Sequence, residues 1–380
     1  MARGENGLIV VAGAPTVVTN SVIAGLVEEG GKGEVLSELY GATAGVAGLL
    51  TGKIVDLGAQ KRKVIDGLRR TPGSVLSGAH RVLEDSESAA FIDVLKEKEI
   101  GTLFVVGGVA AVVVANFFVA AAQNASYELS VLVIAASGDN EVDAGDHNVG
   151  YGSLARFAAS VIRDAGRAAA SGEEPILVVE LGGKNNGFAA AASVLARDAS
   201  NSAPHAILVP EAAVDLENLT DELRRATQKY GYAVVVTGEG AKSSDGASLD
   251  GDALAPILKE RLGLDVRVDK PGSLSRVAQW AIARADSEEA YAIGEQALRL
   301  AGDGMTGFVI TSGRDASSGE RGDRGYRSIV VTTQLDGVSV EARTLQTEHL
   351  GAHGTQVSEE FTDWARPLVG GALPEYISLA

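Results

Sequence analysis

One local pattern recurs along this chain: a short apolar run of strand length, a turn rich in glycine or acidic residues, and then a helix. It occurs at least six times. The apolar runs are Leu8–Val11, Leu103–Val106, Tyr127–Ala135, Pro175–Leu181, Ala206–Val209, Ala233–Thr237 and Phe308–Thr311. Alternating strands and helices predict an α/β doubly wound fold with mostly parallel sheets. In such sheets ligands bind beyond the carboxyl ends of the strands, so the turns after these runs are where we look for chemistry.

The overall charge and composition narrow the kinds of partner. The chain has 380 residues, a net charge of −17 and no cysteine. Such an acidic protein does not suit nonspecific binding to nucleic acid or to an anionic membrane. Without cysteine it has no disulfide, no thiol catalysis and no cysteine-bound metal. The N-terminus lacks the basic region and apolar run of a secretory signal, so we expect a cytoplasmic protein with no nucleic-acid or membrane partner.

The segment Leu103–Ala122 is long and apolar enough to be considered as a membrane span. Gly107-Gly108 interrupts it early, Asn116 lies inside it, and no cluster of lysines or arginines flanks it. We therefore interpret it as a buried strand, Leu103–Val106, followed by a glycine turn and a buried helix.

The stretch from Val131 to Phe157 contains the strongest candidate site. Its apolar strand breaks at Ser137-Gly138, and an acidic loop follows before a helix begins near Gly152. The titratable residues of this loop are Asp139, Glu141, Asp143, Asp146 and His147. Carboxylates at the end of a strand are placed for acid–base chemistry, and the alternative is a solvated acidic loop. The histidines at 147, 205, 349 and 353 have no metal-like spacing, and we interpret them as surface or core residues.

A series of short glycine-, threonine- and arginine-containing blocks runs through the chain from about residue 8 to 376. The blocks are Gly13–Asn20 (GAPTVVTN), Leu68–Ser74 (LRRTPGS), Ser137–Glu141 (SGDNE), Asp146–Phe157, Glu180–Gly187, Glu239 after a strand, Pro271–Arg276 (PGSLSR), and Arg366–Gly370 with Leu373–Tyr376. In this order and spacing they resemble the phosphofructokinase family, in particular its long bacterial members that use pyrophosphate or ATP. No block is decisive alone, and their order carries the resemblance.

The resemblance implies a fold and an activity. The fold consists of two Rossmann-like three-layer domains with mostly parallel sheets. The larger, donor-binding domain would contain residues 1–145 plus 276–328, and the smaller, sugar-phosphate domain residues 146–275 plus 329–380. The implied activity is phosphoryl transfer, with Mg²⁺, from ATP or pyrophosphate to the 1-hydroxyl of fructose 6-phosphate, a step of glycolysis. The implied assembly is a homodimer or homotetramer.

By position in the motifs, the resemblance also implies roles for individual residues. Asp139 would accept the hydroxyl proton, Ser137 would hydrogen-bond the transferring phosphoryl group, and Lys184 stands in the place of a catalytic arginine. The residues implied for the sugar phosphate are Gly183, Glu239, Arg267 and Arg276, with one arginine coming from a neighbouring subunit. Those implied for the donor phosphates are Gly13, His80, Arg81, Gly107 and Gly108. Glu141 would stand near the metal.

Several of these positions depart from the family pattern. The family has G-G-D after the strand that ends near Gly107, and the place of its aspartate is taken by Val109. A valine side chain cannot ligate Mg²⁺, because this hard cation needs oxygen. Lys184 keeps the charge of an arginine but loses its bidentate fork. Ser137-Gly138 replaces Thr-Ile, and Glu141 replaces a shorter aspartate.

Two questions stay open at the level of sequence. For the donor, the small residues Ala110 and Ala136 leave room for a nucleotide and favour ATP, whereas the phosphate loop and the C-terminal tail resemble the group that contains pyrophosphate users. For activity, Asp139 and Glu239 with the two arginines favour an active enzyme. Val109 favours a catalytically impaired relative that binds sugar phosphate or serves as a regulatory or partner subunit.

Overall fold

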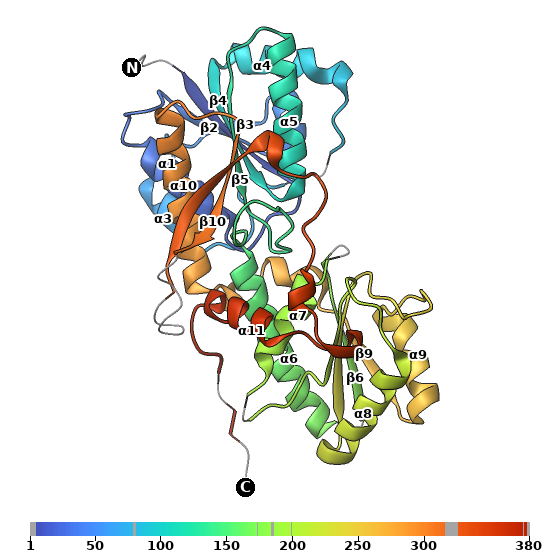
Figure 1. Cartoon of the computed structure of the whole chain (residues 1–380). Coiled ribbons are helices and arrows are strands. Elements are labelled where there is room, and N and C mark those ends of the chain that lie inside the picture. The colour runs from blue at the N-terminus through green and yellow to red at the C-terminus, as the bar shows by residue number, and fades with distance from the viewer. Residues whose placement is uncertain are drawn as a thin grey trace. The chain divides into compact units, whose positions relative to one another are not determined.

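The computed structural model of the chain describes residues 5–78, 81–172, 174–183, 186–198, 200–315, 326–374 and 376–377. The chain forms two compact units, which we describe one at a time (Figure 1). Unit 1 contains Met1–Tyr151 and Arg284–Ala342, and unit 2 contains Gly152–Ala283 and Arg343–Ala380. The sequence-based division into a donor half and a sugar-phosphate half stays a prediction about function.

Unit 1 is built around a sheet that has seven strands over the described residues, in the order β11-β10-β5-β4-β1-β2-β3. The central strands run parallel, and an antiparallel strand lies at each edge, β11 beside β10 and β3 beside β2. The strands are β1 (Asn6–Ala12), β2 (Leu39–Ala42), β3 (Ile54–Asp56), β4 (Ile100–Gly107), β5 (Ser130–Ala135), β10 (Phe308–Arg314) and β11 (Ser328–Gln334).

Helices cover both faces of this sheet (Figure 1). On one face α1 packs against α3 and α10, and on the other α4 packs against α2 and α5. The helices are α1 (Thr19–Gly30), α2 (Gly45–Leu50), α3 (Arg62–Leu68), α4 (Ser88–Glu97), α5 (Val109–Asn124) and α10 (Arg284–Gly302). The sheet is therefore the middle one of three layers.

The apolar segment Leu103–Ala122 lies in the core of unit 1. Strand β4 is buried along its whole length, as expected for a central parallel strand that is covered on both faces. Gly107-Gly108 ends the strand, and α5 then packs its apolar side chains into the same core. The predicted strand, glycine turn and helix are confirmed. Over the described part of the chain, every helix is too short or too polar to cross a membrane.

Unit 2 contains a smaller sheet, which has four parallel strands over the described residues in the order β7-β8-β6-β9. The strands are β6 (Ile176–Leu181), β7 (Ala206–Leu208), β8 (Ala233–Gly238) and β9 (Val266–Asp269). Helices α8 and α9 supply leucines that pack on one face of this sheet, and α6 and α7 lie on the other (Figure 1). The helices are α6 (Tyr151–Ser171), α7 (Phe188–Ala191), α8 (Leu216–Tyr230), α9 (Gly251–Leu262) and α11 (Glu359–Ala365).

Helix α8 illustrates how local chemistry sets the ends of an element. Asp215 precedes the helix, and its side chain accepts hydrogen bonds from the N–H groups of Glu217 and Asn218. Gly231 follows the helix with a φ of +84°, a left-handed conformation that glycine adopts without strain. An acidic N-cap and a glycine after the last turn are the signals from which helix ends are predicted.

The predicted α/β fold with mostly parallel sheets is confirmed in both units. The short strands β2 and β3 and the edge strand β11 were not foreseen. The sequence after the glycine turn that ends at Gly187 predicts one helix over Phe188–Asp198, whereas the structure has a short α-helix, α7, followed by a 3₁₀ helix over Ala192–Ala196. The segment Asp315–Arg324, whose polar sequence predicts a loop, falls, apart from Asp315, outside the described residues.

Candidate active site

Three turns of unit 1 meet at the carboxyl edge of its sheet. Strand β1 pairs with β4 so that Ala12 lies opposite Gly107, and β4 pairs with β5 so that Gly107 lies opposite Ala135. Gly13, Gly108 and Ala136 continue these strands and therefore lie side by side at one edge. This is the edge at which open α/β sheets bind ligands.

The turn after β4 has no room for side chains. A Cβ atom on Gly107 would lie 2.1 Å from the carbonyl oxygen of Ala12, and one on Gly108 would lie 1.7 Å from Glu141 Oε1. Gly107 also has a φ of +156°, which L side chains rarely adopt. Glycine at both positions therefore lets the backbone pass between β1 and the loop after β5, and α5 begins at the next residue.

The carboxylate of Glu141 lies at the start of α5. The backbone N–H of Val109 donates a hydrogen bond to Glu141 Oε1 at 3.2 Å. The first N–H groups of a helix have no partner inside the helix and carry the positive end of its dipole, so an anion is stabilised there. In the family resemblance this place belongs to a donor phosphate. Here a carboxylate from the neighbouring loop contacts the same helix end.

In the turn after β1, backbone N–H groups donate hydrogen bonds to threonine hydroxyls of the same segment. Thr19 Oγ1 accepts from the Thr16 N–H at 2.8 Å, and Thr16 Oγ1 accepts from the Val18 N–H at 3.2 Å. These hydroxyls satisfy two donors that a phosphate at this helix end would otherwise use. Of the other residues predicted for the donor, Arg81 forms an ion pair with Glu87, and His80 lies outside the described residues.

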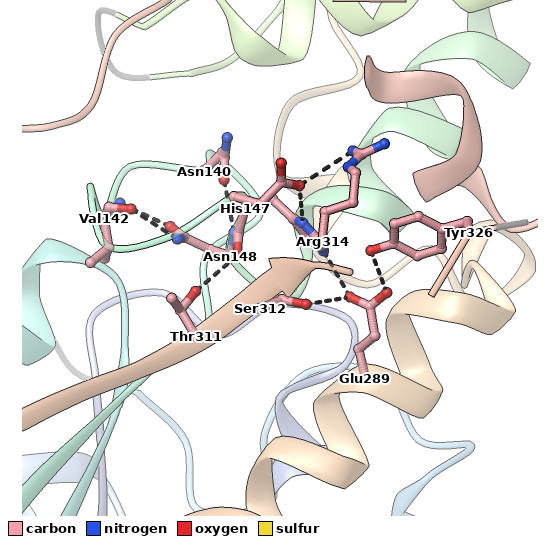
Figure 2. A network of polar contacts seen from close by, with 10 residues as sticks. Asn140, Val142, His147, Asn148, Glu289, Thr311, Ser312, Arg314 and Tyr326 are labelled. Carbon is pink, nitrogen blue, oxygen red and sulfur yellow. Dashed lines mark hydrogen bonds and ion pairs between the residues drawn. The ribbon is translucent and has the colours of Figure 1, made fainter. Parts of the chain in front are cut away.

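The loop after β5 carries Asp139 and is held in place by hydrogen bonds between its own residues. Ser137 is buried, Asp139 is half-buried, and Asn140 has a φ of +54°, a conformation that asparagine tolerates. Asn148 closes the loop, because its N–H donates to Asn140 Oδ1 at 2.8 Å. The side-chain amide of Asn148 also accepts from the Val142 N–H at 2.8 Å and donates to the Val142 carbonyl at 2.9 Å (Figure 2).

His147 lies next to this closure and is 1% exposed. Its Nδ1 is 2.9 Å from Asp146 Oδ2, and its Nε2 is 2.7 Å from Glu289 Oε2 (Figure 2). Glu289, which belongs to α10, also accepts from Ser312 Oγ at 3.1 Å and from the Tyr326 hydroxyl at 2.8 Å. Two carboxylates therefore face one imidazole inside unit 1.

The ionisation of this group follows from its contacts. Burial alone would lower the pKa of His147, but the hydrogen bonds to Asp146 and Glu289 outweigh burial and raise the pKa to about 9. Burial also opposes the charge on Glu289, yet the hydrogen bond and charge of His147 leave the pKa of Glu289 below its usual value. Burial and the neighbouring Glu289 raise the pKa of Tyr326, which stays a neutral donor.

Sequence reasoning did not foresee this role of His147. Glu289 is 142 residues further along the chain, and its two hydroxyl partners lie on still later segments. Local spacing cannot show such a group. The available signal was the adjacent pair Asp146-His147, because a buried histidine beside an acid needs a second partner for its other ring nitrogen.

Unit 2 brings several of the predicted sugar-phosphate residues to the carboxyl edge of its own sheet. Glu239 follows β8, is exposed, and its N–H donates to the carbonyl of Leu181 at 3.3 Å. Gly183 lies two residues beyond Leu181. A small, mostly apolar pocket brings this turn together with the segment that contains Arg276. Its lining includes Leu154, Phe157, Leu181, Gly182, Gly272 and Ser275.

Arg267 lies further back in unit 2. It is on β9 in register with Leu177, whereas Glu239 is at the end of β6 beside Leu181. Four residues of strand correspond to about 13 Å. Arg267 Nη2 instead donates to Asp269 Oδ2 at 2.8 Å. Within unit 2 Arg267 therefore does not join Glu239, and its predicted role stays a prediction. Lys184 lies outside the described residues.

Known proteins resemble this chain over most of its length. The sequence matches the family described as Phosphofructokinase over residues 6–299. The pyrophosphate–fructose 6-phosphate 1-phosphotransferase of Methylococcus capsulatus is 26% identical over 99% of this chain and 96% of its own length. The sulfofructose kinase of Alkalicoccus urumqiensis is 28% identical over 79% of this chain and 81% of its own. The crystal structure of a pyrophosphate-dependent phosphofructokinase from Nitrosospira multiformis, 26% identical, has a TM-score of 0.90 and covers 98% of this chain and 94% of that chain. The chain belongs to the phosphofructokinase family of phosphotransferases.

Proposed function

We propose that this protein transfers a phosphoryl group from pyrophosphate or ATP to the 1-hydroxyl of fructose 6-phosphate. The proposal rests on one observation. Asp139 is a half-buried carboxylate on a loop that is held by hydrogen bonds, and it lies at the edge where β1, β4 and β5 end. The substrates come from the names of relatives that span nearly the whole chain.

Asp139 is the group to which we assign the proton of the attacking hydroxyl. Phosphoryl transfer needs such an acceptor, together with hydrogen-bond donors or cations around the moving phosphate. Ser137 precedes Asp139 by two residues on the same loop and is assigned to hydrogen-bond the moving group. For the sugar phosphate we assign Gly183, Glu239 and Arg276 of unit 2. This assignment is supported because their segments lie close together along the edge of the sheet.

The described residues at the edge of unit 1 do not supply a complete set of magnesium ligands by themselves. The Val109 side chain offers no oxygen, and Glu141 Oε1 already accepts the Val109 N–H. Among the described residues, no group of three or more acidic or histidine side chains is placed to hold a metal ion. Mg²⁺ requires a near-octahedral set of oxygen ligands. We therefore assign no step of the reaction to a metal, and the role of Glu141 as a ligand stays a prediction.

Pyrophosphate is the donor that we favour. Relatives named for pyrophosphate match 97% or more of this chain, whereas relatives named for ATP match between 61% and 72% of it. ATP is the second donor, because the small residues Ala110 and Ala136 lie beside the turns after β4 and β5. Both donors need to be tested.

A second function is favoured by the contact between Glu141 and the start of α5. A carboxylate there opposes the approach of a donor phosphate, because the two anions would use the same helix end. The chain would then bind a sugar phosphate without turnover and act as a regulatory or partner subunit.

An assay of the purified protein separates the two functions. Fructose 6-phosphate and Mg²⁺ are supplied with either pyrophosphate or ATP, and fructose 1,6-bisphosphate is measured beside an Asp139→Ala variant. We expect turnover that the variant lacks. No turnover above the variant with either donor contradicts the first function, and binding of fructose 6-phosphate by calorimetry would then support the second. Sulfofructose, which appears in the name of one relative, is the alternative acceptor to be assayed.

We also propose that the protein works in the cytoplasm as a homodimer or homotetramer. The support is the membership of this chain in the phosphofructokinase family, because the resemblance to that family implies this assembly and this location. Light scattering of the purified protein measures the assembly, and a monomeric mass at assay concentration would contradict it.

A further inference from the structure

A group of buried polar side chains in unit 1 is not used by the proposed chemistry. It contains Asp146, His147, Glu289, Ser312, Arg314 and Tyr326, which we call the His147 cluster (Figure 2). His147 is 1% exposed and Glu289 is 6% exposed. Both groups make their contacts within unit 1, and the proposed chemistry gives them no role. Burying charge is costly, so the cluster needs another explanation.

The contacts of His147 require its charged form. Both ring nitrogens lie within 2.9 Å of a carboxylate oxygen. A neutral imidazole has one N–H donor and one acceptor nitrogen, so it can donate to only one of two carboxylates. The imidazolium donates to both. Removing its proton would place a lone pair against a carboxylate in a buried site.

Charged and hydroxyl groups from β10 and from Tyr326 surround the pair. Glu289 comes from α10, and Ser312 and Arg314 come from β10. Arg314 donates to Asp146 at 3.3 Å, and Tyr326 donates to Glu289. The guanidinium balances one carboxylate, and the imidazolium balances the other. Glu289 has no described cation other than His147 within ion-pair distance.

The cluster is connected to Asp139 by a short covalent and hydrogen-bonded path. The backbone of His147 is fixed to β10, because Thr311 Oγ1 donates to its carbonyl at 2.8 Å. The next residue is Asn148, whose N–H donates to Asn140 Oδ1 at 2.8 Å. The side-chain amide of Asn148 hydrogen-bonds both the N–H and the carbonyl of Val142. Asn140 follows Asp139 directly. An ion pair on α10 thus fixes one end of the loop that presents Asp139.

We propose that the His147–Glu289 ion pair is a positioning device, which holds the loop of residues 139–148 so that Asp139 stays in place for proton transfer. The inference rests on the proposed role of Asp139. The pair acts through the loop and does not contact the reacting atoms. Because the pair exists only while His147 carries its proton, the position of Asp139 depends on pH.

Three variants test the effect on turnover: His147→Gln, Glu289→Gln and the double variant. We expect His147→Gln to lower kcat about 100-fold, the cost of a displacement of about 1 Å at a reacting group. The KM for fructose 6-phosphate should change by less than about threefold, because the loop governs the reacting group and not ground-state binding. Glu29→Gln, which breaks another ion pair of α10, is the control and should leave both constants unchanged.

The pH profile distinguishes positioning from a merely structural role. Wild-type kcat should fall as pH rises through about 9, where His147 loses its proton. Glu289→Gln should move this alkaline limb to lower pH, because it removes one of the two carboxylates that favour the imidazolium. In the double variant the limb should disappear. A limb at the same pH in all variants would overturn the proposal.

Hydrogen exchange tests the loop without any need for turnover. The amides of Asn140, Val142 and Asn148 should exchange faster in His147→Gln than in wild type, and also faster in wild type above pH 9 after correction for the intrinsic rate. Unchanged protection overturns the inference. So does a His147→Gln kcat within about threefold of wild type. If wild type shows no turnover, the proposed function fails, and exchange at these amides still decides the positioning role.

Discussion

Strands β4 and β5 lie side by side in unit 1 and end at the same edge, but the segments that follow them differ in character. After β4, the turn Gly107-Gly108-Val109-Ala110 carries no titratable side chain. After β5, the loop carries Asp139 and is closed by the Asn148 amide and the His147 cluster. A hydrogen bond from the Val109 N–H to Glu141 joins the two segments.

This difference means that the loop after β5 supplies side chains to the proposed chemistry, whereas the turn after β4 supplies only backbone groups. The family pattern places an aspartate at the first segment, and this chain has Val109 there. The turn after β4 contacts the second segment through the backbone groups of Val109 and Gly107, and further contacts to this segment come from β10 and α10. The loss of the aspartate therefore leaves the loop intact. The two segments can be perturbed separately, and each prediction below compares them.

The largest expected difference concerns turnover. Asp139→Asn should lower kcat by about 10²–10⁴-fold, because an amide cannot accept the hydroxyl proton. Val109→Ala at the turn should change kcat by less than about threefold, since no side-chain group is lost from the chemistry. Steady-state assays with pyrophosphate and fructose 6-phosphate measure both. Equal losses in the two variants would remove the distinction between loop and turn.

The fold was predictable where hydrophobic pattern and turn chemistry agree. The apolar runs of β1, β4, β5, β6 and β8 are strands that are buried on both faces, and such strands give continuous runs in the sequence. Strand β11 was missed because it lies at an edge and most of its residues are exposed or half-exposed, so its sequence carries no burial pattern. Strand β3 has three residues, which is too short for a period to appear.

The site was predictable only in part. The position of Asp139 follows from a strand that ends in an acidic loop, which is a local pattern. The role of His147 depends on Glu289 in another helix, and the place of Glu141 depends on how two neighbouring strands pair. The place of Arg267 away from Glu239 within unit 2 depends in the same way on the register of β9, and its predicted role stays a prediction. Contacts between distant segments are set by packing, which single-sequence patterns do not contain.

Stability should separate the two segments next. His147→Leu removes the cation beside the buried Glu289, and breaking one partner of a buried pair costs about 3–5 kcal/mol. Val109→Ala should cost less than about 1.5 kcal/mol, because it removes methyl groups from a half-buried side chain. Hydrogen exchange of the β4 and β5 amides reports the free energy of opening of unit 1. A His147→Leu cost as small as that of Val109→Ala would contradict the ion-pair description.

The pH dependence of stability sharpens the contrast through a second histidine, His205 of unit 2, which is half-buried. The pKa of His147 is raised to about 9, so its contribution is full below about pH 6.5 and is lost as pH rises through 9. In unit 2, burial and Arg197 lower the pKa of His205 to about 4. Protonation of the unfolded chain therefore weakens unit 2 as pH falls from about 6.5 through 4. Exchange of β5 amides should accelerate in alkali and that of β8 amides in acid, and a common response of both strands would be inconsistent with these environments.

The smallest expected effect concerns the one contact that joins the two segments. Glu141→Gln removes a negative charge from the start of α5 but keeps an oxygen that can accept the Val109 N–H. A charge at a helix end is worth about 0.3–1 kcal/mol, so the KM for pyrophosphate should fall by about two- to fivefold when this competing anion is neutralised. Asp143→Asn, which removes a charge from an exposed position of the same loop, is the matched control and should leave this KM unchanged. A rise of the KM in Glu141→Gln would mean that the carboxylate helps to bind the donor, as a metal ligand would. In that case Glu141 would take over the function of the aspartate that Val109 replaces, and the turn and the loop would form one site in place of two separable segments.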